Sequence, residues 1–435
     1  MSKRITAIMI GLLLGLVLFA ACGGGDTAPA GGQPAAQNGG AAAQDDGAAA
    51  PVADGDAVVI SYWKSPHSDI EAELWEPIIA SFESQNPGVV VDHLVVPWGE
   101  MIAQFTIAFA GGMPPDVSYM AEQFVVWADE DQLVDLTPKL PSNFRDIMVG
   151  WDYAYWNGNV YGVPFLTLAS VMFYNVDMFE AAGLSAPTTW EELRSAAAAL
   201  TGDGVYGFTP PLWGPFPHVV GTFLEQNGVS FLYPGTTTMG FNNPQGIASL
   251  QLLRDMMWED RSIPFMDDFT LDEYGHLFAD GRSAISMNQV QYKNDIRIRN
   301  PDLNFGIALS PAGPVSNANY GGVGIMVLAS ASSHQDAAFR FIEYTTFGGG
   351  ANAYLAQLGF FSAFPEFNRE MFEGDPVMEI AQAAVDTLWL WPVDPLFNPN
   401  VVPIMNLEIE AIWRGTKDVP TALSDMDAAI RAVFD

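Results

Sequence analysis

The chain has 435 residues, of which 51 are Asp or Glu and 17 are Lys or Arg, so its formal net charge at pH 7 is −34. This balance argues against a nucleic-acid binder, because neutralising phosphates takes clustered Lys and Arg side chains. It also disfavours a strongly anionic ligand, although a single buried arginine could still hold one.

A short apolar run lies near the start of the chain. Lys3 and Arg4 precede residues 8–19, a stretch that is too short to span a bilayer as a helix and has the layout of a secretory signal. Two small residues then precede Cys22, the only cysteine, as in a bacterial lipoprotein lipobox, although Phe19 stands where leucine is usual. We expect residues 1–22 to be a lipoprotein signal peptide and Cys22 to be the lipid attachment site.

The next segment, residues 23–56, is rich in glycine and alanine and has no aromatic residue. Such a segment has nothing to bury, so we expect a disordered tether. Residues 57–435 are too many for one small core and predict two domains. Without a second cysteine, no intramolecular disulfide is possible, and core burial must carry stability.

The first globular stretch predicts a βαβ unit. Residues 58–62 and 89–96 are strand-like, and between them apolar residues recur at helical spacing. The first strand runs into Ser65 and His67, and a third predicted strand, after a Gly/Pro turn, runs into Glu122 and Gln123. Because ligands bind outside the carboxyl ends of the strands in an open parallel sheet, these polar side chains are candidate ligand contacts.

A long buried strand is predicted in mid-chain at residues 166–175, which are rich in β-branched and aromatic types and carry no charge. Asn175 or Asp177 can cap the helix that follows, and Gly183 can end it in the left-handed conformation. Thr188 or Thr189 can begin another helix. These residues alone fit an ordinary sheet strand as well as a strand that crosses between two domains.

Several segments together resemble a known family. "SYWKSP", "IIASFESQNPGVVVD", "AFAGGMPPDVSYM", "WADEDQLVDLTP" and "GNVYGVPFLTLASVMFYNVDMFEAAGLSAPTTWEEL" are similar, in order and spacing, to the extracellular solute-binding proteins, family 1, of ABC importers. "FADGRSAISM", "NFGIALSPAGP" and "NYGGVGIMVLASASSHQDAAFRFIEYTT" continue the order more loosely. The resemblance implies that Asp116, Asn175 and Asp177 are cap and turn residues rather than ligand contacts.

The resemblance implies an α/β, two-lobe, periplasmic-binding-protein-like (type II) fold, in which each lobe is a mainly parallel sheet flanked by helices. Three hinge crossings would lie near residues 167–171, 321–325 and 359–363. The N-terminal lobe would then comprise residues 57–167 plus 325–358, and the C-terminal lobe residues 168–324 plus 359–435.

The function implied is that of a non-catalytic, extracytoplasmic receptor, anchored to the cell membrane by Cys22 and needing no cofactor or metal. It would bind a carbohydrate between the lobes as a monomer. It would deliver this ligand to two permease subunits that work with a cytoplasmic ATPase pair. Apart from the lipid anchor, no membrane contact and no nucleic acid is implied.

The candidate ligand contacts are polar groups for sugar hydroxyls and aromatic rings for sugar faces. Carried over by position, they are Ser65, His67, Glu122, Gln123, Trp213, Gln289, Gln291, the backbone at Gly322, Trp391, Asp394 and Asn398. The first crossing strand has Thr167, Leu168 and Ala169 where the family often has a polar residue, so the loops are expected to hold more of the ligand.

The sequence supports other functions less well. The glycines at 321, 322 and 324 fit neither a dinucleotide-binding nor a Walker loop, so they are interpreted as strand-crossing glycines. A secreted glycoside hydrolase would need a carboxylate pair, but no spacing singles one out, and no GxSxG or HExxH motif occurs. A binding protein for a polyamine or a glycerol phosphodiester stays open as an alternative.

Overall fold

The computed structural model describes residues 57–210, 217–229 and 240–434. The predicted signal peptide, the lipid attachment site Cys22, the tether and Trp213 lie outside the described residues. Among the described residues, no helix combines the length and the apolar character needed to cross a membrane.

The strands are β1 (Val58–Lys64), β2 (Val89–Val95), β3 (Val117–Met120), β4 (Tyr155–Trp156), β5 (Asn159–Val160), β6 (Gly162–Asn175), β7 (Tyr206–Thr209), β8 (Ser283–Gln289), β9 (Phe305–Ala308), β10 (Asn319–Leu328), β11 (Phe361–Ser362) and β12 (Leu388–Trp389).

The α-helices are α1 (Glu71–Gln85), α2 (Trp98–Ala110), α3 (Phe124–Ala128), α4 (Phe144–Ile147), α5 (Val176–Ala182), α6 (Trp190–Ala199), α7 (Pro217–Gln226), α8 (Pro244–Trp258), α9 (Leu271–His276), α10 (Tyr292–Arg299), α11 (Gln335–Thr345), α12 (Asn352–Leu358), α13 (Pro365–Phe372), α14 (Pro376–Val385), α15 (Val402–Trp413) and α16 (Val419–Phe434). Short 3₁₀ turns are η1 (Thr137–Lys139), η2 (Trp151–Ala154) and η3 (Met266–Asp268), and η4 (Phe397–Val401) is a π-turn.

A ten-stranded sheet organises the described chain, with the order β2-β1-β3-β10-β6-β8-β7 and with β9 and β11 on β6 and β12 on β10. The predicted βαβ unit is confirmed, since β1 pairs in parallel with both β2 and β3. Beyond β3 the sheet is mixed, because β10 is antiparallel to β3 and to β6.

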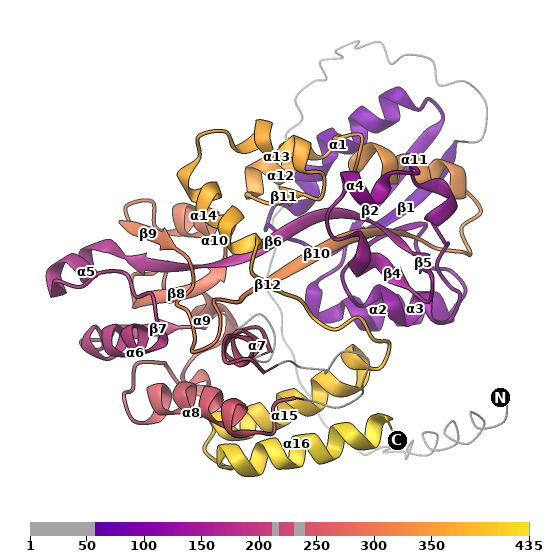
Figure 1. Cartoon of the computed structure of the whole chain (residues 1–435). Coiled ribbons are helices and arrows are strands. Elements are labelled where there is room, and N and C mark those ends of the chain that lie inside the picture. The colour runs from indigo at the N-terminus through magenta and orange to yellow at the C-terminus, as the bar shows by residue number, and fades with distance from the viewer. Residues whose placement is uncertain (1–56, 211–216, 230–239, 435) are drawn as a thin grey trace, which may run out of the picture. The chain divides into compact units, whose positions relative to one another are not determined.

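Strand β6 runs through both halves of this sheet, beside β10 (Figure 1). Its first part, from Gly162 to Ala169, pairs with β10, and from Ser170 onward it pairs antiparallel with β8 and β9. In the second half β7 pairs in parallel with β8 and β12 with the start of β10, whereas β6 is antiparallel to β8 and β9, so this half is a mixed sheet. The expectation of a mainly parallel sheet in the second lobe is therefore corrected.

The three predicted crossing segments lie side by side. Gly321 to Val323 of β10 face Thr167 to Ala169 of β6, and Phe361 of β11 faces Thr167. The hydrophobic core changes at the same point of β6. Its residues up to Leu168 belong to one hydrophobic cluster, and its residues from Ala169 onward belong to two others.

Close packing explains two of the crossing glycines. A Cβ on Gly324 would lie 2.2 Å from the hydroxyl of Tyr119, and a Cβ on Gly321 would lie 2.4 Å from Cδ2 of Leu388. No side chain fits at such distances. The interpretation of these residues as strand-crossing glycines is therefore supported by packing.

The predicted helix caps form as expected. The side chain of Asn175 accepts a hydrogen bond from the backbone N–H of Met178 at 3.0 Å, and Thr189 caps α6. Gly183 ends α5 with a φ of 67°. Asp116 accepts hydrogen bonds from Ser61, which ties the turn before β3 to β1.

Candidate functional site

Tyr320 of β10 marks a place where the two halves of the molecule meet. Its half-buried side chain packs against the hydrophobic cluster of the first half and against one cluster of the second. The Tyr320 ring centroid lies 4.0 Å from that of His218 in α7 and 5.2 Å from that of Trp389 in β12. Trp391 lies close enough to the Tyr320 hydroxyl to affect its pKa.

The aromatic residues that the second half contributes around Tyr320 pack against one another. Trp389 and Trp391 lie 5.7 Å apart between ring centroids, and Trp391 lies 5.8 Å from His218. The indole N–H of Trp389 donates to the hydroxyl of Thr222 at 3.0 Å. Both indoles are mostly buried, so packing holds them in place.

Glu122, from the first half of the molecule, supplies a charged group near Tyr320. Its buried carboxylate accepts a hydrogen bond from the hydroxyl of Tyr153 at 2.9 Å and one from the side-chain amide of Gln123 at 2.8 Å. Burial raises the pKa values of Tyr153 and Tyr320, and the negative charge of Glu122 raises them further. Both phenols therefore stay protonated and can donate hydrogen bonds.

Together these residues form what we call the Tyr320 group, made of Glu122, Tyr153, His218, Tyr320, Trp389 and Trp391. A carboxylate, two phenols, an imidazole and two indoles can hydrogen-bond to hydroxyl groups and pack against an apolar ring face. The group draws on both halves of the molecule. A ligand that touched all of it would contact both halves at once.

A second polar group lies at the end of β1. The ammonium of Lys64, which is fully buried, lies 2.6 Å from a carboxylate oxygen of Glu71 and 2.9 Å from Nδ1 of His67. The rings of Trp98, Tyr119 and Phe360 surround His67. The buried hydroxyl of Ser65, next to Lys64, has no hydrogen-bond partner among the described residues.

Gln289 of the predicted pair is the last residue of β8, and Gln291 lies just beyond it. The amide of Gln291 donates to the side-chain oxygen of Gln289, which joins the two side chains. The side-chain oxygen of Gln291 is buried and has no partner within the described chain. A hydrogen-bond acceptor is therefore available here for a further donor.

The structure thus sorts the predicted site residues into separate places. Glu122, Gln123 and Trp391 lie at the Tyr320 group, and Gly322 is two residues further along β10. Ser65 and His67 lie beside the buried Lys64, away from the Tyr320 group. Asp394 caps a turn, since its carboxylate accepts from the backbone N–H of Leu396 at 2.8 Å. The side chain of Asn398 and all of Trp213 lie outside the described residues.

Sequence reasoning missed four members of the Tyr320 group. Tyr320 directly precedes the crossing glycines, and this adjacency could have identified it. Trp389 is two residues before the predicted Trp391, a spacing that puts both side chains on one face of an extended strand. His218 and Tyr153 carried no signal of their own, because only the fold brings them to Tyr320.

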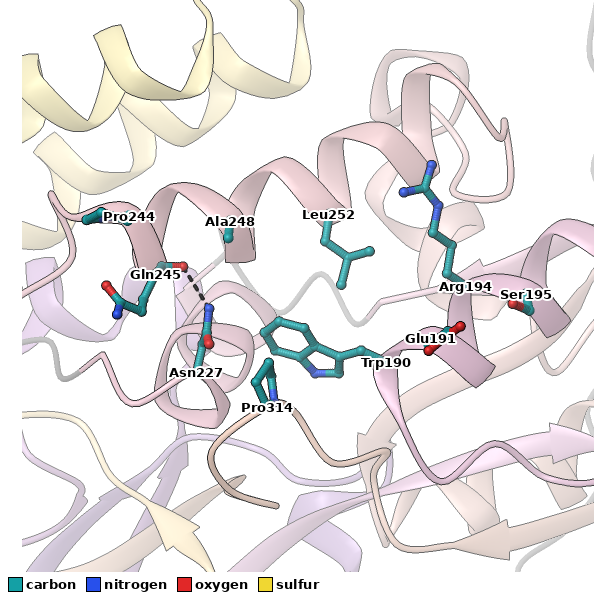
Figure 2. Close-up of a pocket in the computed structure, with 10 residues that line it drawn as sticks. All are labelled: Trp190, Glu191, Arg194, Ser195, Asn227, Pro244, Gln245, Ala248, Leu252 and Pro314. Carbon is teal, nitrogen blue, oxygen red and sulfur yellow. Dashed lines mark hydrogen bonds between the residues drawn. The ribbon is translucent and has the colours of Figure 1, made fainter.

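A separate pocket of about 570 Å³ lies between α6, α8 and the segment around Pro314, and it shares no residue with the Tyr320 group (Figure 2). Three of the polar side chains that line it already have partners. Trp190 donates to Gln226 at 2.6 Å, Arg194 pairs with Asp260 at 2.6 Å, and Asn227 donates to the backbone oxygen of Gln245. Nothing at this pocket indicates a ligand.

The described residues contain no cluster of three or more His, Cys, Asp or Glu side chains placed to hold a metal ion. The Tyr320 group consists of hydrogen-bonding and stacking groups.

Sequence comparisons place the chain among binding proteins. Residues 64–347 match the model of the family described as bacterial extracellular solute-binding protein. A protein of Brucella abortus, named only as a binding protein, is 23% identical over 88% of this chain and 95% of its own. The sn-glycerol-3-phosphate-binding periplasmic protein of Salmonella typhimurium is 22% identical over 84% and 90%, respectively. A lipoprotein of Streptomyces antibioticus is 31% identical over 36% of this chain and 38% of its own.

Solved structures of similar fold include an ABC substrate-binding protein of Listeria monocytogenes in complex with cycloalternan. It has a TM-score of 0.78 and 20% identity, and the match covers 87% of this chain and 99% of that one. An ABC transporter solute-binding protein of Thermotoga lettingae, bound with α-D-tagatose, has a TM-score of 0.79 and 20% identity, over 87% and 100%. The two-lobe fold expected from the sequence is confirmed.

Proposed function

The chain belongs to the bacterial extracellular solute-binding protein family, and from this premise we propose that it is the carbohydrate receptor of an ABC importer. In this role it binds a mono- or oligosaccharide between its two lobes and delivers it to the permease subunits, which work with a cytoplasmic ATPase pair. The role is one of binding and delivery, without catalysis.

The observation that carries this proposal is the Tyr320 group. It combines a buried carboxylate and phenol hydroxyls, which suit sugar hydroxyls, with indole and imidazole rings, which suit the apolar face of a sugar. Proteins of similar fold are named for complexes with cycloalternan and with tagatose, both carbohydrates. Chemistry and fold therefore point to the same class of ligand.

The lobes in this proposal are residues 57–167 plus 325–358 and residues 168–324 plus 359–435. A sugar that touches Glu122 from one lobe and Trp391 from the other stabilises the closed arrangement, because it makes both sets of contacts only there. The permease would then distinguish the loaded receptor by its closed form. The receptor acts as a monomer.

We further propose that Cys22 is lipidated and that residues 23–56 tether the receptor to the outer face of the cell membrane. The lipobox-like sequence before Cys22 and the lipoprotein name of a Streptomyces antibioticus relative support this location. Radiolabelled palmitate should be incorporated by the wild-type chain and not by Cys22→Ala.

A second candidate ligand class is glycerol phosphate, because a Salmonella typhimurium relative that aligns over most of this chain is named for binding sn-glycerol-3-phosphate. The acid excess of the chain weighs against an anionic ligand, since such a ligand needs cationic partners. A polyamine suits the acid excess but makes less use of the aromatic rings. Both classes belong in the binding test.

The test measures tryptophan fluorescence and melting temperature of the purified protein against maltotriose, mannotriose, tagatose, spermidine and sn-glycerol-3-phosphate. A ligand at one hundred times its Kd stabilises the native state by about 2.7 kcal/mol. We expect at least one sugar to raise the melting temperature and change the fluorescence. A shift with spermidine or sn-glycerol-3-phosphate alone contradicts the carbohydrate assignment.

Two tryptophan variants locate the site. Trp391→Phe should weaken sugar binding and reduce the fluorescence change, because it removes an indole of the Tyr320 group. Trp190→Phe, in the separate pocket of Figure 2, should leave binding unchanged. The reverse result would move the site away from Tyr320.

A further inference from the structure

Lys64 is a charged side chain with no exposure to solvent, at the last position of β1. Its ammonium donates to the backbone oxygen of Ser65 at 2.9 Å and lies 4.9 Å from the ring centroid of Tyr119 and 5.2 Å from that of Tyr354. A buried charge is costly unless it is paired and hydrogen-bonded. The buried ammonium of Lys64 must therefore be stabilised by its partners.

Glu71, which is 2% exposed, pairs with Lys64 and is itself fully hydrogen-bonded. One carboxylate oxygen also accepts from the indole of Trp75 at 2.8 Å and from the hydroxyl of Tyr354 at 2.9 Å. The other oxygen accepts from the backbone N–H of His67 at 2.8 Å. The ion pair thereby holds both the backbone and the ring of His67.

The contact between Lys64 and His67 determines where the imidazole proton lies. An ammonium has only donors, so Nδ1 of His67, at 2.9 Å, must be the acceptor. The proton of the neutral ring is then on Nε2, which lies 3.4 Å from the hydroxyl of Tyr119. Tyr354, also 3.4 Å from Nδ1, does not compete, because its hydroxyl donates to Glu71.

We infer that Lys64 is a positioning residue: paired with Glu71, it fixes His67 as the neutral Nε2–H tautomer, so that residues 65–67, which the sequence places among the ligand contacts, form a preset, uncharged loop. The indole of Trp98 completes this arrangement by donating to the backbone oxygen of Pro66 at 2.6 Å. That residues 65–67 contact a ligand rests on the proposed function. The tautomer of His67 follows from its own contacts and does not depend on that function.

Electrostatics agrees with this geometry. A protonated His67 would direct an Nδ1–H at the Lys64 ammonium, with no acceptor between them. Burial lowers the pKa of His67 well below its ordinary value, and the charge of Lys64 lowers it further. Burial also lowers the pKa of Lys64 to about 8, against the opposing effect of Glu71. At neutral pH, the groups facing His67 are thus an ammonium, a carboxylate and the phenols of Tyr119 and Tyr354.

The consequence for recognition is a loop that neither changes charge nor rearranges in mildly acidic surroundings. The contacts that a neutral ligand makes with residues 65–67 then have the same strength at pH 5.5 and at pH 7.5. Without Lys64, the ring takes a second proton more readily and exchanges tautomers, so the strength of these contacts depends on pH.

The test is long-range ¹H–¹⁵N NMR of the imidazole nitrogens in the ¹⁵N-histidine-labelled protein, which has only five histidines. His67→Gln assigns the signal. In the wild type we expect the pattern of a neutral Nε2–H ring that does not titrate between pH 5.5 and pH 7.5. A wild-type His67 with its proton on Nδ1, or with a midpoint near 6.5, overturns the inference.

Lys64→Met, of similar length but without charge, should raise the midpoint of His67 toward the ordinary histidine value of about 6.5, because it removes one of the two causes that lower the pKa, and should mix the tautomers. Lys139→Met is the matched control, because Lys139 pairs with Asp336 at 3.6 Å and lies over Phe339 in the same half of the molecule, at a partly exposed position. It should leave His67 unchanged. If Lys64→Met does not fold, the wild-type spectrum still decides.

Ligand binding is a separate readout. For a sugar that binds the wild type, calorimetry should give a larger loss of affinity between pH 7.5 and pH 5.5 for Lys64→Met than for the wild type. Lys139→Met should lose no more affinity than the wild type does. If no sugar binds, the proposed function fails while the tautomer result stands.

Discussion

The hydroxyl of Tyr153 donates a 2.9 Å hydrogen bond to Glu122, and through it a phenol from a short 3₁₀ turn and a carboxylate beyond the end of β3 act as one polar unit. The unit lies beside Tyr320, where aromatic residues of the other half converge. Its charge makes it the part of the Tyr320 group most sensitive to a single change.

Glu122→Gln should weaken sugar binding about ten- to one-hundredfold, because a hydrogen bond to a charged group contributes about 1.5–3 kcal/mol. Calorimetry with a sugar that binds the wild type measures the loss. Glu130→Gln changes an exposed carboxylate and should have no effect. Equal affinities for Glu122→Gln and the wild type would remove Glu122 from the site.

Asp295→Asn should stabilise the protein at pH 7.5 and do so less at pH 4.5. Burial raises the pKa of Asp295 to about 6, and the charge of Asp69 adds to this. The native state therefore holds this proton more tightly than the unfolded chain does, and stability from this group is lost as pH rises through 6. We expect a gain of about 1 kcal/mol at pH 7.5, reduced for the partial exposure of the group.

Thermal melts at the two pH values, with Asp302→Asn as an exposed control, check this prediction. It is contradicted if Asp295→Asn and Asp302→Asn behave alike at pH 7.5.

His93→Gln should make stability less sensitive to acid. Burial, and then the charge of Lys64, lower the pKa of His93 to about 4. The stability that comes from a neutral His93 is full above about 6.5, the unfolded value, and is lost as pH falls through 4, because the unfolded ring takes up a proton that the native ring does not. Urea unfolding at pH 7 and pH 4.5 should show a loss smaller by about 1–2 kcal/mol in the variant. Equal losses would place His93 in contact with solvent.

Gly324→Ala should be clearly more destabilising than Gly322→Ala, two residues away on β10. The first Cβ would lie 2.2 Å from the hydroxyl of Tyr119, whereas the second would have its nearest neighbour, in Leu168, at 3.4 Å. Overpacking of this kind costs about 1–3 kcal/mol. Unfolding free energies of the two variants give the comparison, and a smaller loss for Gly324→Ala would mean that Tyr119 moves aside easily.

Asn175→Ala should lower stability by about 1 kcal/mol, through loss of the cap on α5, and leave sugar affinity unchanged. Melting curves and calorimetry on the same sample separate the two effects. A large loss of affinity with little loss of stability would return Asn175 to the list of ligand contacts.

Much of the fold could be predicted from local patterns. The βαβ unit and the caps Asn175 and Thr189 depend on neighbours within a few residues, and the structure has them where the sequence predicts them. The long strand β6 is also present, but it begins at Gly162, before the predicted start at residue 166. The mixed pairing of the second half could not be read in this way. It depends on β6 continuing from one half into the other, which brings strands far apart in the chain beside it.

The residues of the candidate site also fall into those that local patterns predict and those that only the fold brings together. By itself, the sequence determined the family, the order of the elements and the strand ends at which polar side chains such as His67 and Glu122 emerge, because periodicity and turn residues act locally. Only the tertiary structure decided that Tyr153, His218 and Trp389 lie around Tyr320, and that Lys64 is buried against His67. Those contacts join residues whose positions follow from how distant strands pair and helices pack, and no local pattern carries that information.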